Sequence, residues 1–226
     1  MIQKLLSIIY PKICLGCNTL LLKNEDIICT TCFYELPYTY HFTNSFNETY
    51  KKFYGLVPIE FGVSFLYFNE GGIVQKMVHN LKYKNKQKVG VYFAQLFAND
   101  LQKLVEHYVV DEIIPVPLHK KKYHVRGYNQ VETFGKTLSA RLGIVYNDKL
   151  LFRNKNSKTQ TKKNKEERQK VENAFEARFL EHNYNKHYLL IDDVITTGST
   201  LENCVKALLE IPNAKVSIAT MAYTLS

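Results

Sequence analysis

The sequence of 226 residues contains no apolar run long enough to cross a membrane. A membrane-spanning helix needs roughly 20 consecutive apolar residues. The short N-terminal apolar run, residues 5–10, is interrupted by Ser7 and stopped by Pro11. It is too short for the core of a signal peptide, and it lacks a small-residue cleavage site. We therefore expect a cytoplasmic protein without membrane insertion, in which this run forms a short helix packed on the domain behind it.

Internal repeats and low-complexity stretches are also absent, and acidic residues are outnumbered by basic ones. The chain has 30 Lys and Arg against 21 Asp and Glu, which gives a formal net charge of +9. Residues 1–60 contain equal numbers of Lys and acidic residues, so the whole excess lies on residues 61–226. We expect an anionic partner, such as nucleic acid, a phosphorylated small molecule or an acidic protein, to meet this C-terminal part.

Cysteines are few, and four of the five form two close pairs with two residues between the members of each pair. In a reducing compartment such pairs are metal ligands more often than disulfides. Four thiolates can complete a closed tetrahedral site, which is typical of structural zinc. An iron–sulfur cluster and four unligated cysteines are the alternatives. The expected metal ligands are Cys14, Cys17, Cys29 and Cys32, whereas Cys204 lies on an apolar helix face and is expected in the core.

The hydrophobic pattern alternates between strands and helices from residue 61 onwards. Strands are expected at residues 61–68, 109–116, 188–194 and 216–222, and helices from residue 73 and at residues 89–107, 128–142 and 199–210. This alternation implies an α/β fold, with a parallel sheet and helices on both faces. Residues 38–58, rich in Tyr, Phe, Asn and Thr, are interpreted as a connector.

Residues 188–201 are the most informative stretch. An apolar strand ends in Asp192 and Asp193, and a turn rich in Thr and Gly then leads into a helix. Ligands of parallel α/β sheets bind where the strands end, and small residues at a helix N-terminus present backbone N–H groups to phosphate. The alternative is an ordinary turn in which the acids cap the helix. The candidate phosphate-binding residues are Thr196, Thr197, Gly198, Ser199 and Thr200.

This combination resembles the signature of type I phosphoribosyltransferases. The resemblance implies that Asp192 and Asp193, the candidate catalytic residues, bind the ribose hydroxyls of phosphoribosyl diphosphate (PRPP). It also implies that the following loop binds the 5′-phosphate, and that Mg²⁺ accompanies the ligand. The sequence shows no recognisable hood of the kind that selects the nucleobase in enzymes of this fold.

A second stretch, residues 114–130, resembles the ComF family at its diphosphate-side loop. The residues expected to contact the diphosphate are Lys120, Lys121, Lys122, Arg126, Asn129 and Gln130. The alternative is a basic surface turn. The cysteine pairs, the tripeptide Leu81, Lys82 and Tyr83, and residues between Arg153 and Phe175 follow the same family's order, so the resemblance covers nearly the whole chain.

The ComF resemblance implies a small zinc-ribbon-like module with a connector at residues 1–58, and a phosphoribosyltransferase-like domain at residues 59–226. It also implies a link to DNA uptake in natural transformation. Two functions stay open. The chain is either a phosphoribosyltransferase with an undefined acceptor, or a non-enzymatic accessory protein that binds single-stranded DNA and a competence helicase and keeps the PRPP pocket as a relic. Release of diphosphate from PRPP distinguishes them.

Two basic segments, residues 76–88 and 149–170, could follow the phosphates of a single strand. The tyrosines available for stacking on its bases are expected to be Tyr83, Tyr92, Tyr123 and Tyr128. The alternative is a solvated basic surface without a partner.

The cysteine pairs give the first testable prediction. Purified protein should contain about one zinc ion per chain, as one closed tetrahedral site requires. Elemental analysis of folded protein measures this content. Folded protein that contains no metal would contradict the interpretation.

Overall fold

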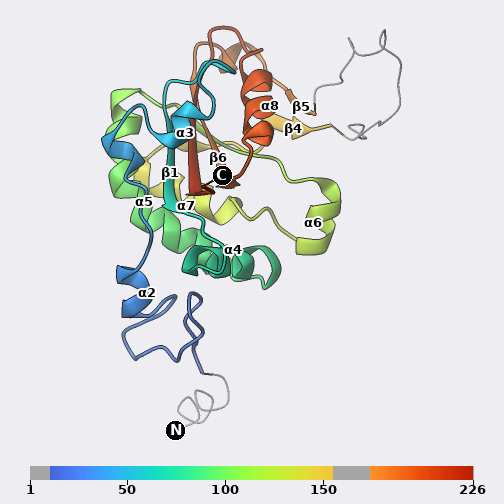
Figure 1. The fold of residues 1–226 in the computed structure, drawn as a ribbon. Coiled ribbons are helices and arrows are strands. Elements are labelled where there is room, and N and C mark those ends of the chain that lie inside the picture. The colour runs from blue at the N-terminus through green and yellow to red at the C-terminus, as the bar shows by residue number, and fades with distance from the viewer. Residues whose placement is uncertain (1–10, 155–173, 226) are drawn as a thin grey trace, which may run out of the picture.

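The computed structural model describes residues 11–154 and 174–225. In these residues a five-stranded sheet has the order β1-β7-β6-β2-β3, and every neighbouring pair is parallel (Figure 1). Its strands are β1 (Gly62–Tyr67), β2 (Glu112–Pro115), β3 (Val145–Tyr146), β6 (His187–Ile195) and β7 (Lys215–Tyr223). The predicted α/β class with a parallel sheet is confirmed. The N-terminal apolar run and most of the second basic segment lie outside the described residues.

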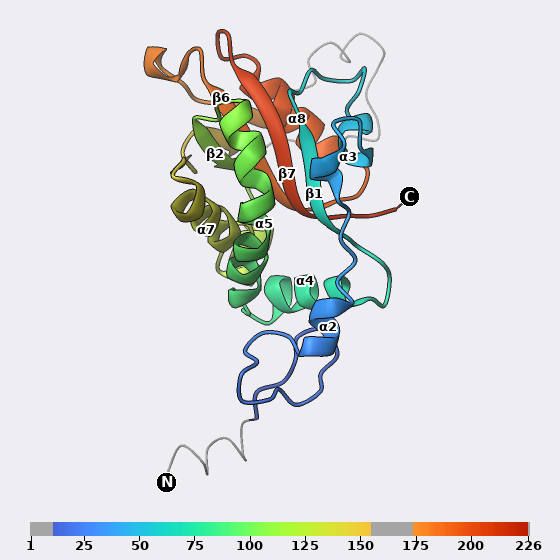
Figure 2. The same cartoon turned by 90° about the vertical axis from the view of Figure 1, so that its left-hand side faces the viewer.

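Helices cover the sheet and its carboxyl edge. The main helices are α4 (Ile73–Tyr83), α5 (Lys88–His107), α6 (Lys120–Arg126), α7 (Glu132–Leu142) and α8 (Ser199–Leu208). Figure 2 shows α5 and α7 on one face of the sheet and α4 below the ends of the strands. No helix in the described part of the chain is long and apolar enough to span a membrane.

Strand β6 is buried on both of its faces. Leu189 and Ile191 belong to the core under α5 and α7, whereas Tyr188 and Leu190 belong to the core under α8. Successive side chains of a strand point to opposite faces, so a strand covered on both sides needs a continuous apolar run. This explains why the sequence predicted the strand so directly.

Some element boundaries differ from the prediction for local reasons. Val109 has a left-handed backbone, with φ of 52°, so β2 begins only after it. The start of α7 is delayed because the Asn129 side chain donates to the Val116 carbonyl and accepts from the Val131 N–H. The basic stretch predicted as a loop contains the helix α6, whose N-terminus is capped by His119.

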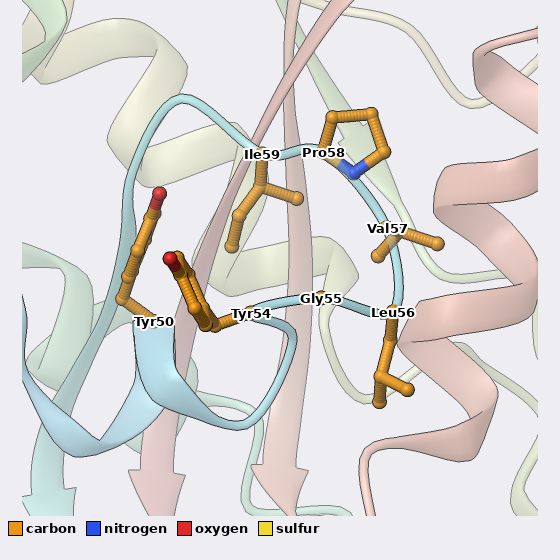
Figure 3. Close-up of a pocket in the computed structure, with 7 residues that line it drawn as sticks. All are labelled: Tyr50, Tyr54, Gly55, Leu56, Val57, Pro58 and Ile59. Carbon is orange, nitrogen blue, oxygen red and sulfur yellow. The ribbon is translucent and has the colours of Figure 1, made fainter.

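The segment predicted as a connector contributes to the core. It contains the short helices η1 (His41–Thr43) and α3 (Glu48–Lys51), and a chain that crosses in front of the strands toward α8 (Figure 3). Phe53, Val57 and Ile59 are buried in the core that α8 shares with β6. These side chains thus complete the apolar layer on the α8 face of the sheet.

A chain of buried hydroxyls ties α3 to the sheet. Thr49 Oγ1 lies 2.7 Å from Ser64 Oγ, which lies 2.8 Å from Thr220 Oγ1. All three residues are fully buried, and buried polar groups of this kind persist because they satisfy one another. The position of α3 beside β1 is therefore fixed by specific bonds as well as by apolar packing.

A two-stranded antiparallel ribbon, β4 (Leu151–Arg153) and β5 (Phe175–Ala177), was not predicted from the sequence. Each strand is only three residues long, which gives too little periodicity for recognition. Leu151 and Phe175 join the core of α8, so the ribbon packs beside that helix.

The core role of the connector is testable by replacing Phe53, whose side chain is 1% exposed. Phe53→Ala should lower the free energy of unfolding by about 3–5 kcal/mol, because it leaves a cavity under α8. Urea denaturation measures the change. The neighbouring Tyr54→Ala is the control, and it should cost less than about 1 kcal/mol because Tyr54 is 67% exposed. Equal effects of the two substitutions would contradict the assignment.

Candidate functional site

The four paired cysteines form one cluster. The Sγ atoms of Cys14, Cys17, Cys29 and Cys32 all lie within 4.8 Å of one another. Cys14 Sγ accepts hydrogen bonds from the backbone N–H groups of Gly16 and Cys29, at 3.4 and 3.2 Å. Four converging sulfurs with backbone donors fit a metal ion that prefers thiolates, such as zinc. The structure therefore brings all four predicted ligands together.

The thiols of the cluster are not equivalent. The hydroxyl of Thr19 lies 3.0 Å from Cys17 Sγ and lowers the pKa of Cys17 to about 6, whereas burial raises the pKa of Cys32. Metal ligation requires the thiolate form of each cysteine. Metal binding would thus release a proton from Cys32 more than from Cys17.

The cysteine module rests on α4. The Asn80 side chain donates to the Leu15 carbonyl at 3.3 Å. Gly16 packs so closely that a Cβ atom there would lie 2.8 Å from Ile73 Cγ2 and 3.0 Å from Cys32 Sγ. Contact at two turns of the helix fixes the module against α4, so the cysteine cluster and this helix form one unit.

The C-terminal end of α4 reaches the predicted acidic pair. Lys82 Nζ lies 2.9 Å from Asp193 Oδ2, and the two side chains are 21% and 7% exposed. The carbonyl of Leu81 accepts a hydrogen bond from the Tyr128 hydroxyl, and the Arg126 guanidinium lies 5.2 Å from the centre of the Tyr83 ring. The tripeptide Leu81, Lys82 and Tyr83 thus joins α4 to β6 and to the chain after α6.

The two acids have different surroundings because adjacent residues of a strand face opposite sides. Asp193 has the ion pair with Lys82, whereas Asp192 has no ion pair within the described residues. Burial and the neighbouring Asp193 raise the pKa of Asp192, and the charges of Lys82 and Lys122 oppose this rise. A carboxyl with a strongly perturbed pKa at a strand end is typical of a functional position.

The predicted phosphate loop follows β6 directly. Thr196, Thr197, Ser199 and Thr200 are exposed, and only Gly198 is buried. Gly198 has φ of 83°, a conformation that favours glycine, and α8 starts at the next residue. The hydroxyls of Thr197 and Ser199 lie 3.1 Å apart. Exposed hydroxyls at the start of a ten-residue helix suit an anion.

The diphosphate-side residues divide into two groups. Lys120, Lys121 and Lys122 are exposed on α6, which stands away from the sheet (Figure 1). Among them Lys122 is near enough to influence the pKa of Asp192. Arg126 donates to Gln130 Oε1 at 2.7 Å, and Asn129 stabilises its own turn. Gln130 and Asn129 thus shape the segment, whereas the cations offer positive charge.

One of the four tyrosines proposed for base stacking is buried, and a second is partly buried. Tyr128 is 8% exposed and donates its hydroxyl to the Leu81 carbonyl. Tyr92 packs against the core, and burial raises its pKa to about 12. Tyr128 is a correction to the sequence-based hypothesis, because its ring faces the interior, whereas Tyr92 keeps part of its surface exposed. Tyr83 and Tyr123 are 62% and 51% exposed, and the Arg126 guanidinium lies over the Tyr83 ring.

Sequence reasoning missed one cation. Lys52, in the segment predicted as a connector, donates a hydrogen bond to the Thr196 carbonyl at 2.6 Å. Arg153 has a buried Nε atom without a hydrogen-bond partner in the described residues. No sequence signal marks Lys52, because its contact spans most of the chain. A pocket of about 400 Å³ is lined by residues 50 and 54–59 (Figure 3), and none of the predicted site residues lines it.

The parallel sheet, the strand that carries the acidic pair and the four-cysteine cluster define an α/β protein with an N-terminal cysteine module that could hold a metal ion such as zinc. No family model matches the chain. Competence protein F of Haemophilus influenzae is 29% identical over 65% of this chain and 66% of that protein. DNA utilization protein YhgH of Salmonella typhimurium is 26% identical over 66% of each chain. Competence protein ComFC of Streptococcus pneumoniae is 35% identical over 54% of this chain and 50% of that protein.

These similarities support assignment of the chain to the ComF family. The matched region spans just under two thirds of the length of the first two relatives and half of the third.

The different surroundings of Asp192 and Asp193 predict that the free energy of unfolding depends on pH. The ordinary pKa of an aspartate is about 4, and the pKa of Asp192 in the folded state is raised to about 7. Asp192 therefore destabilises the folded state progressively as the pH rises from about 4 to about 7. Asp192→Asn should therefore be more stable than wild type at pH 8, by at least about 1 kcal/mol, and equal to it near pH 4. Urea unfolding across this pH range measures the difference.

The matched substitution at the neighbouring acid should act in the opposite direction. Asp193→Asn leaves the Lys82 ammonium without its carboxylate and should destabilise the protein by about 1–3 kcal/mol at neutral pH. If Asp192→Asn shows the pH profile of wild type, the assigned difference between the two acids is wrong.

Proposed function

We propose that the chain binds PRPP, or a related phosphoribosyl ligand, together with Mg²⁺, and that it serves DNA uptake. In this proposal residues 1–58 supply the metal module and connector, and residues 59–226 supply the ligand-binding domain. The observation that carries the proposal is the convergence of the acidic pair, the hydroxyl-rich loop and several cations at one edge of the sheet.

The acids suit the ribose. Two carboxylates can accept hydrogen bonds from adjacent hydroxyl groups. The ion pair with Lys82 orders the Asp193 side chain before a ligand binds. Asp193 therefore offers a hydrogen-bond acceptor with little further loss of conformational entropy. Asp192, which lacks such a partner in the described chain, would gain one from a bound hydroxyl or cation. This gain would offset the cost of its burial.

The phosphate and diphosphate would lie on either side of the ribose. The exposed hydroxyls and backbone N–H groups at the start of α8 would bind the 5′-phosphate. Lys122 and Arg126 would stabilise the diphosphate, and bound Mg²⁺ would neutralise part of its charge. If the chain transfers the phosphoribosyl group, a bond from the anomeric carbon to the acceptor forms as the bond to the diphosphate breaks, and Lys122 and Arg126 would stabilise the departing anion.

A second function, binding of single-stranded DNA, is favoured by the surface around α6. The helix exposes Lys120, Lys121 and Lys122 beside Tyr123, and Tyr83 lies under the Arg126 guanidinium. Cations interleaved with exposed aromatic rings suit the phosphates and bases of a single strand. The relatives' names, competence protein and DNA utilization protein, support the same process. A competence helicase would be the protein partner.

Calorimetric titration of PRPP with Mg²⁺ tests the first function. Wild type should bind, and an Asp192→Ala/Asp193→Ala variant should bind at least about tenfold more weakly, which corresponds to about 1.4 kcal/mol. Glu202→Gln is the matched control. This acid lies on α8 one turn after the loop and pairs with Lys206, and its loss should leave affinity unchanged. Thr197→Ala/Ser199→Ala alters only exposed hydroxyls and tests the loop without disturbing the core.

Three outcomes of this experiment are distinct. Weakened binding by both site variants supports the pocket, and diphosphate release with an added acceptor would then identify an enzyme. Equal binding by wild type and the double-acid variant contradicts the site. Absence of binding by folded wild type contradicts PRPP as the ligand. Salt-sensitive binding of single-stranded DNA by the same protein would then leave the accessory function.

A further inference from the structure

The lysine at the C-terminal cap of α3 lies over the candidate phosphate loop. Lys52 Nζ donates to the Thr196 carbonyl at 2.6 Å and lies 5.1 Å from the centre of the Tyr223 ring. A Cβ atom at Gly198 would lie 3.3 Å from Cγ and Cδ of Lys52. The side chain thus touches the loop with both its apolar stem and its charged end.

The backbone that carries Lys52 is fixed. Its N–H group donates to the Glu48 carbonyl, and the next residue, Phe53, is 1% exposed in the core. One turn earlier, Thr49 is tied to Ser64 through buried hydroxyls at 2.7 Å. An element anchored on both sides of the lysine can hold the ammonium at one place with little loss of conformational entropy on binding.

The contact has a consequence for the shape of the loop. Thr196 is exposed, and its carbonyl accepts the Lys52 hydrogen bond. A hydrogen bond from a charged donor is stronger than one between neutral groups, so it fixes the peptide plane directly after β6. Because the lysine stem packs on Gly198, a side chain at this position would displace the lysine as well as strain the backbone, where φ is 83°.

The ammonium also has capacity beyond this bond. It carries three donors and a full positive charge, and the Thr196 carbonyl takes one donor. The adjacent Lys51 is different, because its Nζ lies 5.1 Å from the centre of the Phe46 ring and away from the loop. Lys52 therefore places its charge at the loop, whereas Lys51 places its charge beside Phe46.

We propose that Lys52 is the positioning residue of the phosphate loop, and that it supplies the positive charge by which the N-terminal segment contributes to binding a terminal phosphate. The inference rests on the proposed function for its ligand, a phosphate monoester such as the 5′-phosphate of PRPP. The positioning part stands on the contacts of Lys52 with Thr196 and Gly198 and does not need the ligand. The loop would thus be preorganised by a residue far away in the sequence.

Amide hydrogen exchange of the ligand-free protein tests the positioning part. Lys52→Met keeps an apolar stem and removes the charged donor, so exchange at residues 196–200 should become about tenfold faster. Lys51→Met is the matched control and should leave these amides unchanged. Lys52→Arg should restore most of the protection. Unchanged loop exchange in Lys52→Met would overturn the positioning role.

Titration with inorganic phosphate and with PRPP, followed at the same loop amides, tests the charge. Lys52→Met should bind both ligands about tenfold more weakly than wild type, whereas Lys51→Met should match wild type. Equal affinity of Lys52→Met and wild type would overturn the charge contribution. If wild type binds neither ligand, the proposed function and the charge contribution both fail, and the exchange result alone decides the positioning role.

Discussion

A buried carboxylate at the end of the central strand β6 is the constraint on which the arrangement of this molecule depends. Asp193 is almost fully enclosed, and a buried charge without a partner is costly. Lys82 supplies the opposite charge from the end of α4. This pairing holds α4 below the carboxyl edge of the sheet, and the cysteine module rests on the same helix through Gly16 and Asn80. One ion pair thus links the helix that carries the cysteine cluster to the candidate ligand site.

The candidate site is assembled from segments that are far apart in the sequence. Parallel strands end at one edge, so whatever follows each strand meets there. Strand β6 brings the acids and the loop, and the chain after β2 brings the cations of α6. The connector adds Lys52, although it carries no recognisable motif. Net positive charge in the C-terminal part therefore acts together with one cation from the neutral N-terminal part.

The sequence predicted what depends on local pattern. Strand β6 has a continuous apolar run, and the paired cysteines have a spacing that four ligands of one metal require, so both were found. The partners of Asp193 and Thr196 depend on tertiary contacts, and the sequence held no signal for the contact of Lys52. Tyr128 was interpreted as exposed because it lies among basic residues, yet its ring faces the core. Polarity of neighbours in sequence does not fix the direction of a single side chain.

The position of β7 has a consequence for synthesis of the protein on the ribosome. This strand comes last of the described strands in the chain, yet it lies between β1 and β6 in the sheet. Strand β1 emerges early from the ribosome and pairs with β7 in the described sheet. This pairing cannot form until most of the chain has been translated. Such long-range pairing slows folding and prolongs the time during which partly folded chains expose apolar surface. Nascent chains of this protein would therefore expose the unpaired edge of β1 until β7 has been translated.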